Sequence, residues 1–584
     1  MGNKEIGVKK KKKKKKEKFI TLNKRQKISL GATSIIAIAA LVTGIYFFLE
    51  LEELEEFIFK CGLSGAPDSI DPLKNPGPRF ENLIIIDQIA EGLFAYDQNK
   101  TDTPIVHNLA RGGSWSPDHL NFTCTLRTNV RFHDGTPFNA AAVKWNFDRI
   151  YKFIEIMPDS DTWAWYPAYL DSEGKPIINH TEIINDYTVK FVLNHPYVPI
   201  RDLLTIWTSY ILSPTSTPDD DFIDIRTEKL VGTGPFIFDS CEVDLHGNGL
   251  KTDMHANPDY WGGTPSIDKL SFLALYSGTE RMERMLSGEL SYAVGSSNDY
   301  RLAIYRNTTG ITVIPKTRLN FFFLGMNNNR INVTMRRAIS YAFNYTRRIE
   351  VIWGGHAEKP RSPLSNRMRY SNWDDFDVPD YNITRARQLL IAVNWPGTSG
   401  LTPNDNITTG NEWEMIANSP TPLGTYHFST VSSWMELLAN QTLADLKQIG
   451  VKVNILKMGG VEFWDELYAS NHTMFSVGWG VTRTDPVDVI NPLYSSKVDG
   501  VGVANWINFN DTEVQLWMEQ ALEEFNETKR EKLYSNIQQH LIEQVNPVLW
   551  LAHPINYDIW DSDVKGIPID GAPLRLILKF CYLT

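Results

Sequence analysis

The sequence predicts an α/β protein of at least two lobes, held at the membrane by one helix near its N-terminus. Its 584 residues exceed the length of about 250–300 residues at which a single hydrophobic core stops growing. After residue 60, short segments with strand-like and helical periodicity alternate, and no repeat or low-complexity tract interrupts them. The third observation is an uncharged stretch of 22 residues, Ile28–Leu49.

This stretch has the length of a membrane-spanning helix, because a hydrocarbon core of about 30 Å requires about 20 apolar residues. Eight consecutive lysines, Lys9–Lys16, precede it, and the acid-rich segment 50–56 follows it. Positively charged residues that flank a membrane helix stay in the cytoplasm. Residues 1–27 are therefore expected inside the cell, and the body of the protein that follows the helix is expected outside. A cleaved signal peptide is the alternative, but the bulky Tyr46–Phe48 stand where its small residues belong. We therefore expect an uncleaved, single-pass anchor in the cell membrane.

Sequons and cysteines also favour an extracellular body. Twelve N-x-T sequons follow the predicted anchor and indicate a glycoprotein, with chance in an Asn- and Thr-rich chain as the alternative. The four cysteines lack the C-x-x-C spacing of a zinc site and can pair with one another outside the cell. The net charge of −11 argues against nucleic acid as a partner. The sequons begin at Asn99, Asn121, Asn179, Asn307, Asn332, Asn344, Asn382, Asn406, Asn440, Asn471, Asn510 and Asn526, and the cysteines are Cys61, Cys124, Cys241 and Cys581.

Periodicity and turn residues predict the elements of the body. Asn121–Phe132 alternates apolar and polar residues, as a half-buried strand does. Gly and Pro mark His133–Pro137 as a turn, and Ala140–Tyr151 has the pattern of a helix. Further predicted elements are a helix at Thr334–Tyr345, a helix at Trp434–Ile449 ended by Gly450, a strand at 451–455, and two helices within Thr512–Val545 broken near Asn526.

No catalytic signature occurs in the chain. The phosphate-binding, zinc-protease, serine-hydrolase and dinucleotide motifs are all absent from the sequence. Gly232–Gly234 precedes a strand-like segment rather than a helix, so it does not form a phosphate site. No histidine pair has metal-ligand spacing. We expect a receptor rather than an enzyme, with neither cofactor nor metal.

A series of motifs carries a resemblance to one family. The most specific stretch is Ser116–Lys144, in which Phe132–Phe138 reads FHDGTPF. The other motifs, in chain order, are Ser69–Pro72, Glu91–Tyr96, Val231–Phe236, Asn257–Gly263, Arg336–Ala342, Gly478–Trp479 and Asp485–Pro486. Over residues 65–570 the chain resembles the family 5 extracellular solute-binding proteins, which are the peptide, dipeptide and nickel receptors of ABC importers.

The resemblance implies a two-lobed, periplasmic-binding-protein-like fold of type II with an extra domain. The lobes are expected to close around a ligand, and two crossings of the chain between them would form the hinge. The implied division is a basic tail at 1–27, the anchor at 28–49, a linker at 50–61, lobe I at 62–96, 194–314 and 546–584, the extra domain at 97–193, and lobe II at 315–545.

The resemblance also suggests ligand-binding residues. The segment Met474–Trp479 is expected to form a strand that ends in Gly-Trp. Peptide receptors of the family carry W-x-x-D here, and the Asp meets the α-amine of the peptide. Here Trp479 is followed by Thr482 in the place of that Asp, then by Arg483 and Asp485. Either Asp485 takes the amine, or the ligand has no free amine there. Further candidates are Asn327, Trp434 and Phe94, whereas the FHDGTPF turn is expected to be scaffold.

The leading functional hypothesis is a peptide receptor that delivers its ligand to an ABC permease. An oligosaccharide receptor of the same family is the alternative, since aromatic side chains are abundant and the amine-binding Asp is missing. Nickel is disfavoured because no histidine cluster occurs. An anchored hydrolase and a surface-layer or adhesion protein are the remaining hypotheses; peptide turnover would support the first, and two-lobed closure would contradict the second.

Overall fold

The computed structural model describes residues 56–74, 80–100, 104–156, 166–171, 173–295, 301–317, 319–376, 378–404, 411–496, 504–568 and 576–584. The predicted tail and anchor, together with the linker up to residue 55, lie outside these ranges. No helix within these ranges is long and apolar enough to cross a membrane. Residues 57–584 belong to one unit, and this unit carries the two lobes.

The first lobe is built on a mixed sheet. Its elements are β1 (Ile58–Leu63), α2 (Phe80–Ile89), α4 (Ile200–Leu203), η2 (Trp207–Ser209), β8 (Phe236–Val243), β9 (Gly249–Ala256), β10 (Lys269–Ala274), α5 (Gly278–Leu286), β11 (Tyr292–Gly295), α6 (Leu302–Arg306), β12 (Ile311–Thr317), β19 (Val564–Lys565) and β20 (Tyr582–Leu583). Phe59, Cys61 and Leu63 alternate along β1 and are fully buried, as the period of two requires. β1 pairs in parallel with both β10 and β11, which makes it an interior strand of this lobe.

A four-stranded antiparallel sheet, in the order β4-β5-β7-β6, shares a continuous core with the first lobe. The elements of this region are β2 (Phe94–Tyr96), β3 (Ile105–His107), β4 (Ala110–Trp115), β5 (Asn121–Leu126), α3 (Ala140–Ile156), η1 (Tyr166–Tyr169), β6 (Ile178–Asn185) and β7 (Thr188–Leu193). The strand predicted at Asn121–Phe132 is wrong beyond Leu126, because the Arg127 N–H leaves the β5 ladder and donates to the Leu109 carbonyl. The predicted turn at His133–Pro137 is confirmed, and Gly135 adopts a φ of 83° there.

The second lobe has helices on both faces of its sheet. Its elements are β13 (Phe321–Met326), α7 (Val333–Ala342), α8 (Tyr345–Trp353), β14 (Ala357–Glu358), α9 (Ile383–Ala392), α10 (Glu412–Ala417), β15 (Gly424–Thr430), α11 (Ser433–Lys447), β16 (Val451–Lys457), α12 (Gly460–Tyr468), β17 (Met474–Trp479), α13 (Val487–Tyr494), α14 (Thr512–Glu523), α15 (Glu527–Gln539) and the π-helical turn η3 (His540–Val545). Phe321 and Phe323 of β13 enter one core, whereas Leu324 and Met326 enter the core on the opposite face. Such alternation is the signature of a strand buried on both sides.

The predicted helices of this lobe are largely confirmed. The helix predicted at Trp434–Ile449 is α11, and Gly450 follows it with a φ of 76°. The break near Asn526 separates α14 from α15, and the Asn526 side chain caps α15. The helix predicted at Thr334–Tyr345 is too long, because Phe343 is extended and Asn344 caps a second helix, α8.

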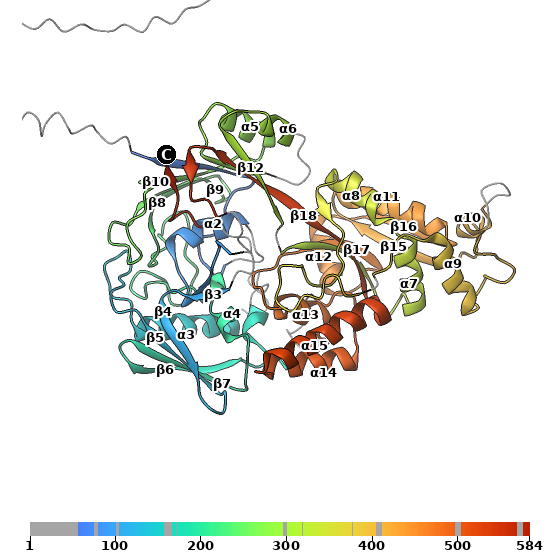
Figure 1. Cartoon of the computed structure of the whole chain (residues 1–584), viewed down its shortest axis with the longest axis horizontal. Coiled ribbons are helices and arrows are strands. Elements are labelled where there is room, and N and C mark those ends of the chain that lie inside the picture. Colours follow the sequence, from blue (N-terminus) through green and yellow to red (C-terminus); the bar gives the residue numbers. More distant parts are fainter. Residues whose placement is uncertain are drawn as a thin grey trace, which may run out of the picture. The chain divides into compact units, whose positions relative to one another are not determined.

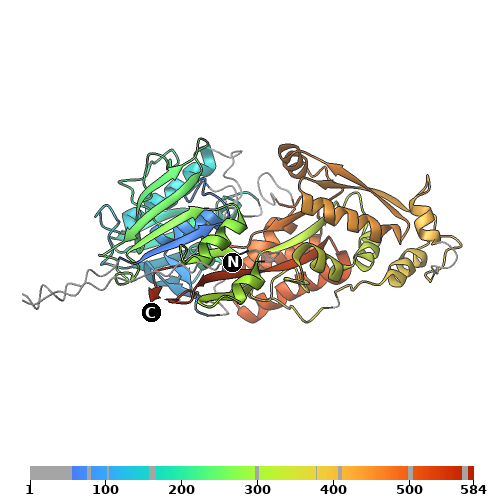
Figure 2. The same cartoon turned by 90° about the horizontal axis from the view of Figure 1, so that it is seen from above.

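One long strand, β18 (Val548–Asp561), crosses between the lobes. Its first part pairs with β13 and β14, and from Ile555 onward it pairs with β12. The other crossing runs from the end of β12 at Thr317 to the start of β13 at Phe321. Figures 1 and 2 show β18 passing from one lobe to the other. Two crossing segments are the usual basis of a hinge.

Candidate ligand-binding site

The two lobes touch through a chain of polar side chains. Arg369 of the second lobe forms an ion pair with Asp202 on α4 of the first lobe, and its Nη2 lies 3.5 Å from Asp485 Oδ2. The Tyr96 hydroxyl donates to Asp202 at 2.7 Å and accepts from the Thr484 N–H at 3.2 Å. Asp202, Asp485 and Tyr96 are buried. The site between the lobes is therefore lined by groups that already pair with one another.

Asp485 is held inside the second lobe by Arg530 of α15. Arg530 Nη1 lies 2.6 Å from Oδ2 and Nη2 lies 3.0 Å from Oδ1, so the pair is bidentate. The carboxylate also accepts from the Val487 N–H at the start of α13. Burial alone would raise the pKa of Asp485, but the charges of Arg530 and Arg369 outweigh it and hold this pKa at about 2.

The loop 479–488 follows β17 and folds back on the carboxylate of Asp488. The backbone N–H of Thr482 donates to Asp488 Oδ2 at 2.5 Å, and that of Arg483 donates to the same atom at 3.1 Å. Arg483 Nε donates to Oδ1 at 2.8 Å. The Trp479 indole N–H donates to the Asp488 carbonyl at 3.0 Å. These bonds give the loop a fixed shape in which Asp488 is saturated with donors.

Arg483 is a buried cation between the lobes. Its burial would lower the pKa of its guanidinium, but the charge of Asp488 outweighs burial and raises it. Tyr96 and Tyr197 on the first-lobe side interact electrostatically with this guanidinium, and so does Tyr169. Burial raises the pKa values of Tyr169 and Tyr197 to about 12, so both hydroxyls stay neutral.

An aromatic cluster extends from Trp479 toward the surface of the second lobe. The ring centroids of Trp479 and Trp506 are 6.2 Å apart. Trp506 is in turn 6.3 Å from Trp464 and 6.1 Å from Tyr468, both on α12. Trp464 and Tyr468 are stacked and remain 42% and 41% exposed. The cluster joins the loop 479–488 to an accessible aromatic surface.

A match to a known protein family shows what kind of protein has this site. Residues 104–500 match the model described as "Bacterial extracellular solute-binding proteins, family 5 Middle". The chain belongs to the family 5 extracellular solute-binding proteins. The resemblance noted in the sequence is thereby confirmed, and a solute-binding role follows from it.

This solute-binding protein is similar to known proteins over most of its length. It is 23% identical to the probable D,D-dipeptide-binding periplasmic protein DdpA of Escherichia coli, over 80% of this chain and 83% of that protein. It is 27% identical to di/tripeptide-binding protein 2 of Pseudomonas aeruginosa, over 79% of this chain and 84% of that protein. Among solved structures, DppA of Helicobacter pylori in complex with the peptide STSA gives a TM-score of 0.71 at 23% identity, covering 91% of this chain and all of that one. This similarity confirms the two-lobed α/β fold.

Several of the predicted ligand residues of this solute-binding protein come together in the structure. Trp479, Thr482, Arg483 and Asp485 share the loop at the interlobe contact. Trp434 lies in the first turn of α11 and packs edge-to-face on Phe322, with ring centroids 5.4 Å apart. Phe322 is the register partner of Gly478, next to Trp479.

Asn327 and Phe94 do not join this group. Asn327 follows β13, where its amide donates to the Ser470 and His472 carbonyls. Met326 pairs with Met474, so Asn327 lies at the opposite end of β17 from Trp479. Phe94 packs in the first-lobe core against Phe122.

Sequence reasoning missed residues that complete the site. Arg369, Asp202, Tyr96, Arg530 and Asp488 were not predicted. Asp488 lies only three residues after Asp485, so its nearness in the sequence could have indicated it. The others come from distant elements, and no motif marks Arg369 or Arg530.

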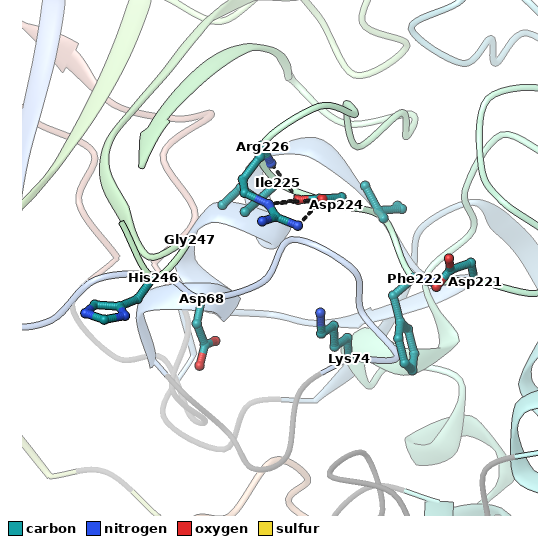
Figure 3. Close-up of a pocket in the computed structure, with 10 residues that line it drawn as sticks. Asp68, Lys74, Asp221, Phe222, Asp224, Ile225, Arg226, His246 and Gly247 are labelled. Carbon is teal, nitrogen blue, oxygen red and sulfur yellow. Dashed lines mark hydrogen bonds and ion pairs between the residues drawn. The ribbon is translucent and has the colours of Figure 1, made fainter. Parts of the chain in front are cut away.

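A separate polar cavity of about 350 Å³ lies on the first-lobe side (Figure 3). Arg226 and Asp224 form an ion pair in it, with Nη2 at 2.6 Å from Oδ2. Lys74 and His246 also line it. None of the described residues that line it belongs to the second lobe, so this cavity is distinct from the interlobe contact.

Proposed function

We propose that this chain is a membrane-anchored extracellular receptor of an ABC importer, which captures peptides between its lobes and delivers them to a permease. The observation that carries the proposal is the interlobe site, where the loop 479–488 of the second lobe faces Tyr96, Tyr169 and Tyr197. The similar proteins named above add support, since two are named for dipeptides or tripeptides and one is bound to a peptide. We expect binding without turnover.

Peptide capture suits the chemistry of this site. Extended peptides are recognised largely through their backbone, so a receptor needs buried hydrogen-bonding groups and room for varied side chains. The indole N–H of Trp506 and Nη1 of Arg483 are buried and have no hydrogen-bond partner among the residues that the structure describes. Carbonyl groups of a peptide would satisfy such donors. Arg483 is therefore proposed as a ligand-facing residue. We propose the same for its loop neighbours Trp479 and Thr482, with Trp434 behind Trp479.

Closure about the two chain crossings would bring ligand contacts from both lobes together. The domain limits given above, including an extra domain at 97–193 and lobe II at 315–545, are part of this proposal. Asp485 is also part of this proposal. We propose that it supports the shape of the site through its ion pair with Arg530. Phe94 and Asn327 would support the fold on either side of the site.

An oligosaccharide ligand is the second candidate. The half-exposed Trp464 and Tyr468 favour it, because stacked aromatic rings offer flat apolar surface to sugar rings. Native mass spectrometry of the purified full-length chain separates the candidates, since a co-purified ligand is released on denaturation and fragmented. Peptide fragments would support the main proposal. Saccharide fragments would replace it with the second candidate.

The membrane anchor is a further part of the proposal. It rests on the uncharged segment Ile28–Leu49 between the lysine run and the acid-rich segment. Protease treatment of intact cells that express the full chain is the test. Digestion of the body with retention of a membrane-bound fragment containing Ile28–Leu49 is expected. Full protection of residues 60–584 would contradict an extracellular body.

A further inference from the structure

Arg483 carries a donor that no group among the described residues satisfies. The residue is only 4% exposed. Its Nε donates to Asp488, but Nη1 has no acceptor in any of the described ranges of the chain. Leaving a buried charged donor unpaired is costly, and such groups in native proteins call for a specific partner. The missing partner must bring a lone pair, since guanidinium nitrogens only donate.

The carboxylates around this loop are already engaged. Asp488 accepts from Thr482 and Arg483, Asp485 from Arg530, and Asp202 from Tyr96 and Arg369. A ligand ammonium buried here would need a carboxylate of its own. It would also face the positive charge of Arg483. An ammonium is therefore poorly matched to this part of the site.

The first-lobe side adds a second unsatisfied donor. The indole N–H of Trp207 is buried and has no hydrogen-bond partner within the described residues. The adjacent Thr208 bonds to the Tyr169 hydroxyl at 2.9 Å, and Tyr169 interacts electrostatically with Arg483. Within the described part of the chain, each side of the contact therefore has a buried donor that lacks an acceptor: Arg483 Nη1 on one side and the Trp207 indole N–H on the other.

We propose that the loop 479–488 binds an acceptor at the end of the ligand, through Arg483 Nη1, and thus selects peptides whose α-amine is acylated. This inference rests on the proposed peptide-receptor function and specifies its ligand class. The acyl carbonyl accepts the Arg483 donor, and acylation removes the positive charge that this end would otherwise carry into the site.

The test uses the full-length chain and two probes: a randomised tetrapeptide mixture and the same mixture after N-acetylation. Native mass spectrometry of both mixtures in competition measures their relative occupancy. We expect the acetylated mixture to bind about tenfold or more tightly, as for one charge-assisted hydrogen bond gained. Tighter binding of the free-amine mixture, or equal binding, would overturn this inference alone. Binding of neither mixture would overturn the peptide function and this inference with it.

A variant tests whether Arg483 is responsible. Arg483→Lys keeps a positive charge near Asp488 but removes the Nη1 donor. We expect it to lose the preference for acetylated peptides while retaining weaker binding of both mixtures. Arg361→Lys, at an arginine side chain that is 59% exposed, is the matched control and should keep the preference. Retention of the full preference by Arg483→Lys would overturn the proposal. The wild-type competition remains decisive if the variant does not fold.

Discussion

Arg530 and Asp485 form a bidentate ion pair from which solvent is excluded. The two contacts measure 2.6 and 3.0 Å, and the side chains are 2% and 0% exposed. Arg369 of the second lobe, which also pairs with Asp202 of the first lobe, approaches the same carboxylate. The Asp485 carboxylate, which was a candidate for binding a ligand amine, is thus already paired with two arginines. This pairing favours the alternative that the ligand has no free amine at this position.

Asp485→Asn should therefore affect stability more than ligand choice. Removing one partner of a buried ion pair costs about 3–5 kcal/mol, because the remaining charge stays buried. We expect a lower denaturation midpoint and an equal change in affinity for free and N-acetylated peptides. Asp374→Asn is the control, since this carboxylate is 79% exposed in its ion pair with Arg361 and should change stability by less than about 1 kcal/mol. Unchanged stability together with a selective loss of free-amine peptides would restore Asp485 as the amine site.

Arg369→Met should loosen the contact between the lobes. The variant keeps much of the side-chain volume but leaves Asp202 and Asp485 without their shared cation across the interface. We expect a larger radius of gyration of the ligand-free protein in small-angle scattering. Arg361→Met lies in the same segment at an exposed position and should leave the scattering curve unchanged. Indistinguishable curves for the two variants would mean that Arg369 does not hold the lobes together.

Local features of the fold were predictable because they depend on neighbouring residues. Gly450 ends α11, and Asn526 marks the boundary between α14 and α15, as the sequence indicated. The interlobe contact was not predictable in this way. Asp202 and Arg369 are 167 residues apart and neither stands in a recognisable motif. Their pairing depends on how two lobes meet, which no local pattern encodes.

The position of Asn327 illustrates a second limit of local reasoning. A residue at the end of a strand lies near a site only if that end of the sheet faces the site. β13 and β17 are antiparallel, so the end of β13 coincides with the beginning of β17 and not with Trp479. Strand order and direction decide this, and both follow from tertiary pairing.

Some of the sequons have a structural explanation as well. Asn332, Asn344, Asn382 and Asn526 are N-cap residues, and each side chain accepts a hydrogen bond from the third residue of its helix. A capping role accounts for asparagine at these positions whether or not it carries a glycan. Asn406 lies outside the described residues. Glycosylation stays a prediction that intact-mass measurement can test.

The cysteines should be largely unreactive in the native protein. All four lie among the described residues and are free thiols, and Cys61, Cys124 and Cys581 are buried. Burial raises the pKa of Cys581 to about 12 and raises those of Cys61 and Cys124 further. Reaction requires the thiolate, so we expect that at most the half-buried Cys241 reacts readily with a thiol reagent. Fewer than four thiols after denaturation without reductant would reveal a disulfide and contradict this expectation.

His553 is a buried histidine at the hinge. It lies on β18 just before the strand passes from β14 to β12, and its ring bonds to the backbone of Asn320 in the other crossing segment. Burial lowers the pKa of His553 to about 4, although the bond to Asn320 favours the charged ring. Phe321 and Trp373 pack against it at 5.7 and 5.2 Å. The ring is therefore neutral in the folded protein at physiological pH.

Stability should consequently fall as the pH falls from about 6.5 toward 4. In this window the unfolded chain binds a proton at His553, whose ordinary pKa is about 6.5, whereas the folded chain does not. His553→Gln removes this titration, so its thermal midpoint should depend less on pH than that of the wild type. His180→Gln, at a side chain that is 48% exposed, is the control and should follow the wild-type profile. Parallel pH profiles for His553→Gln and the wild type would show that the histidine at the hinge does not contribute to acid sensitivity.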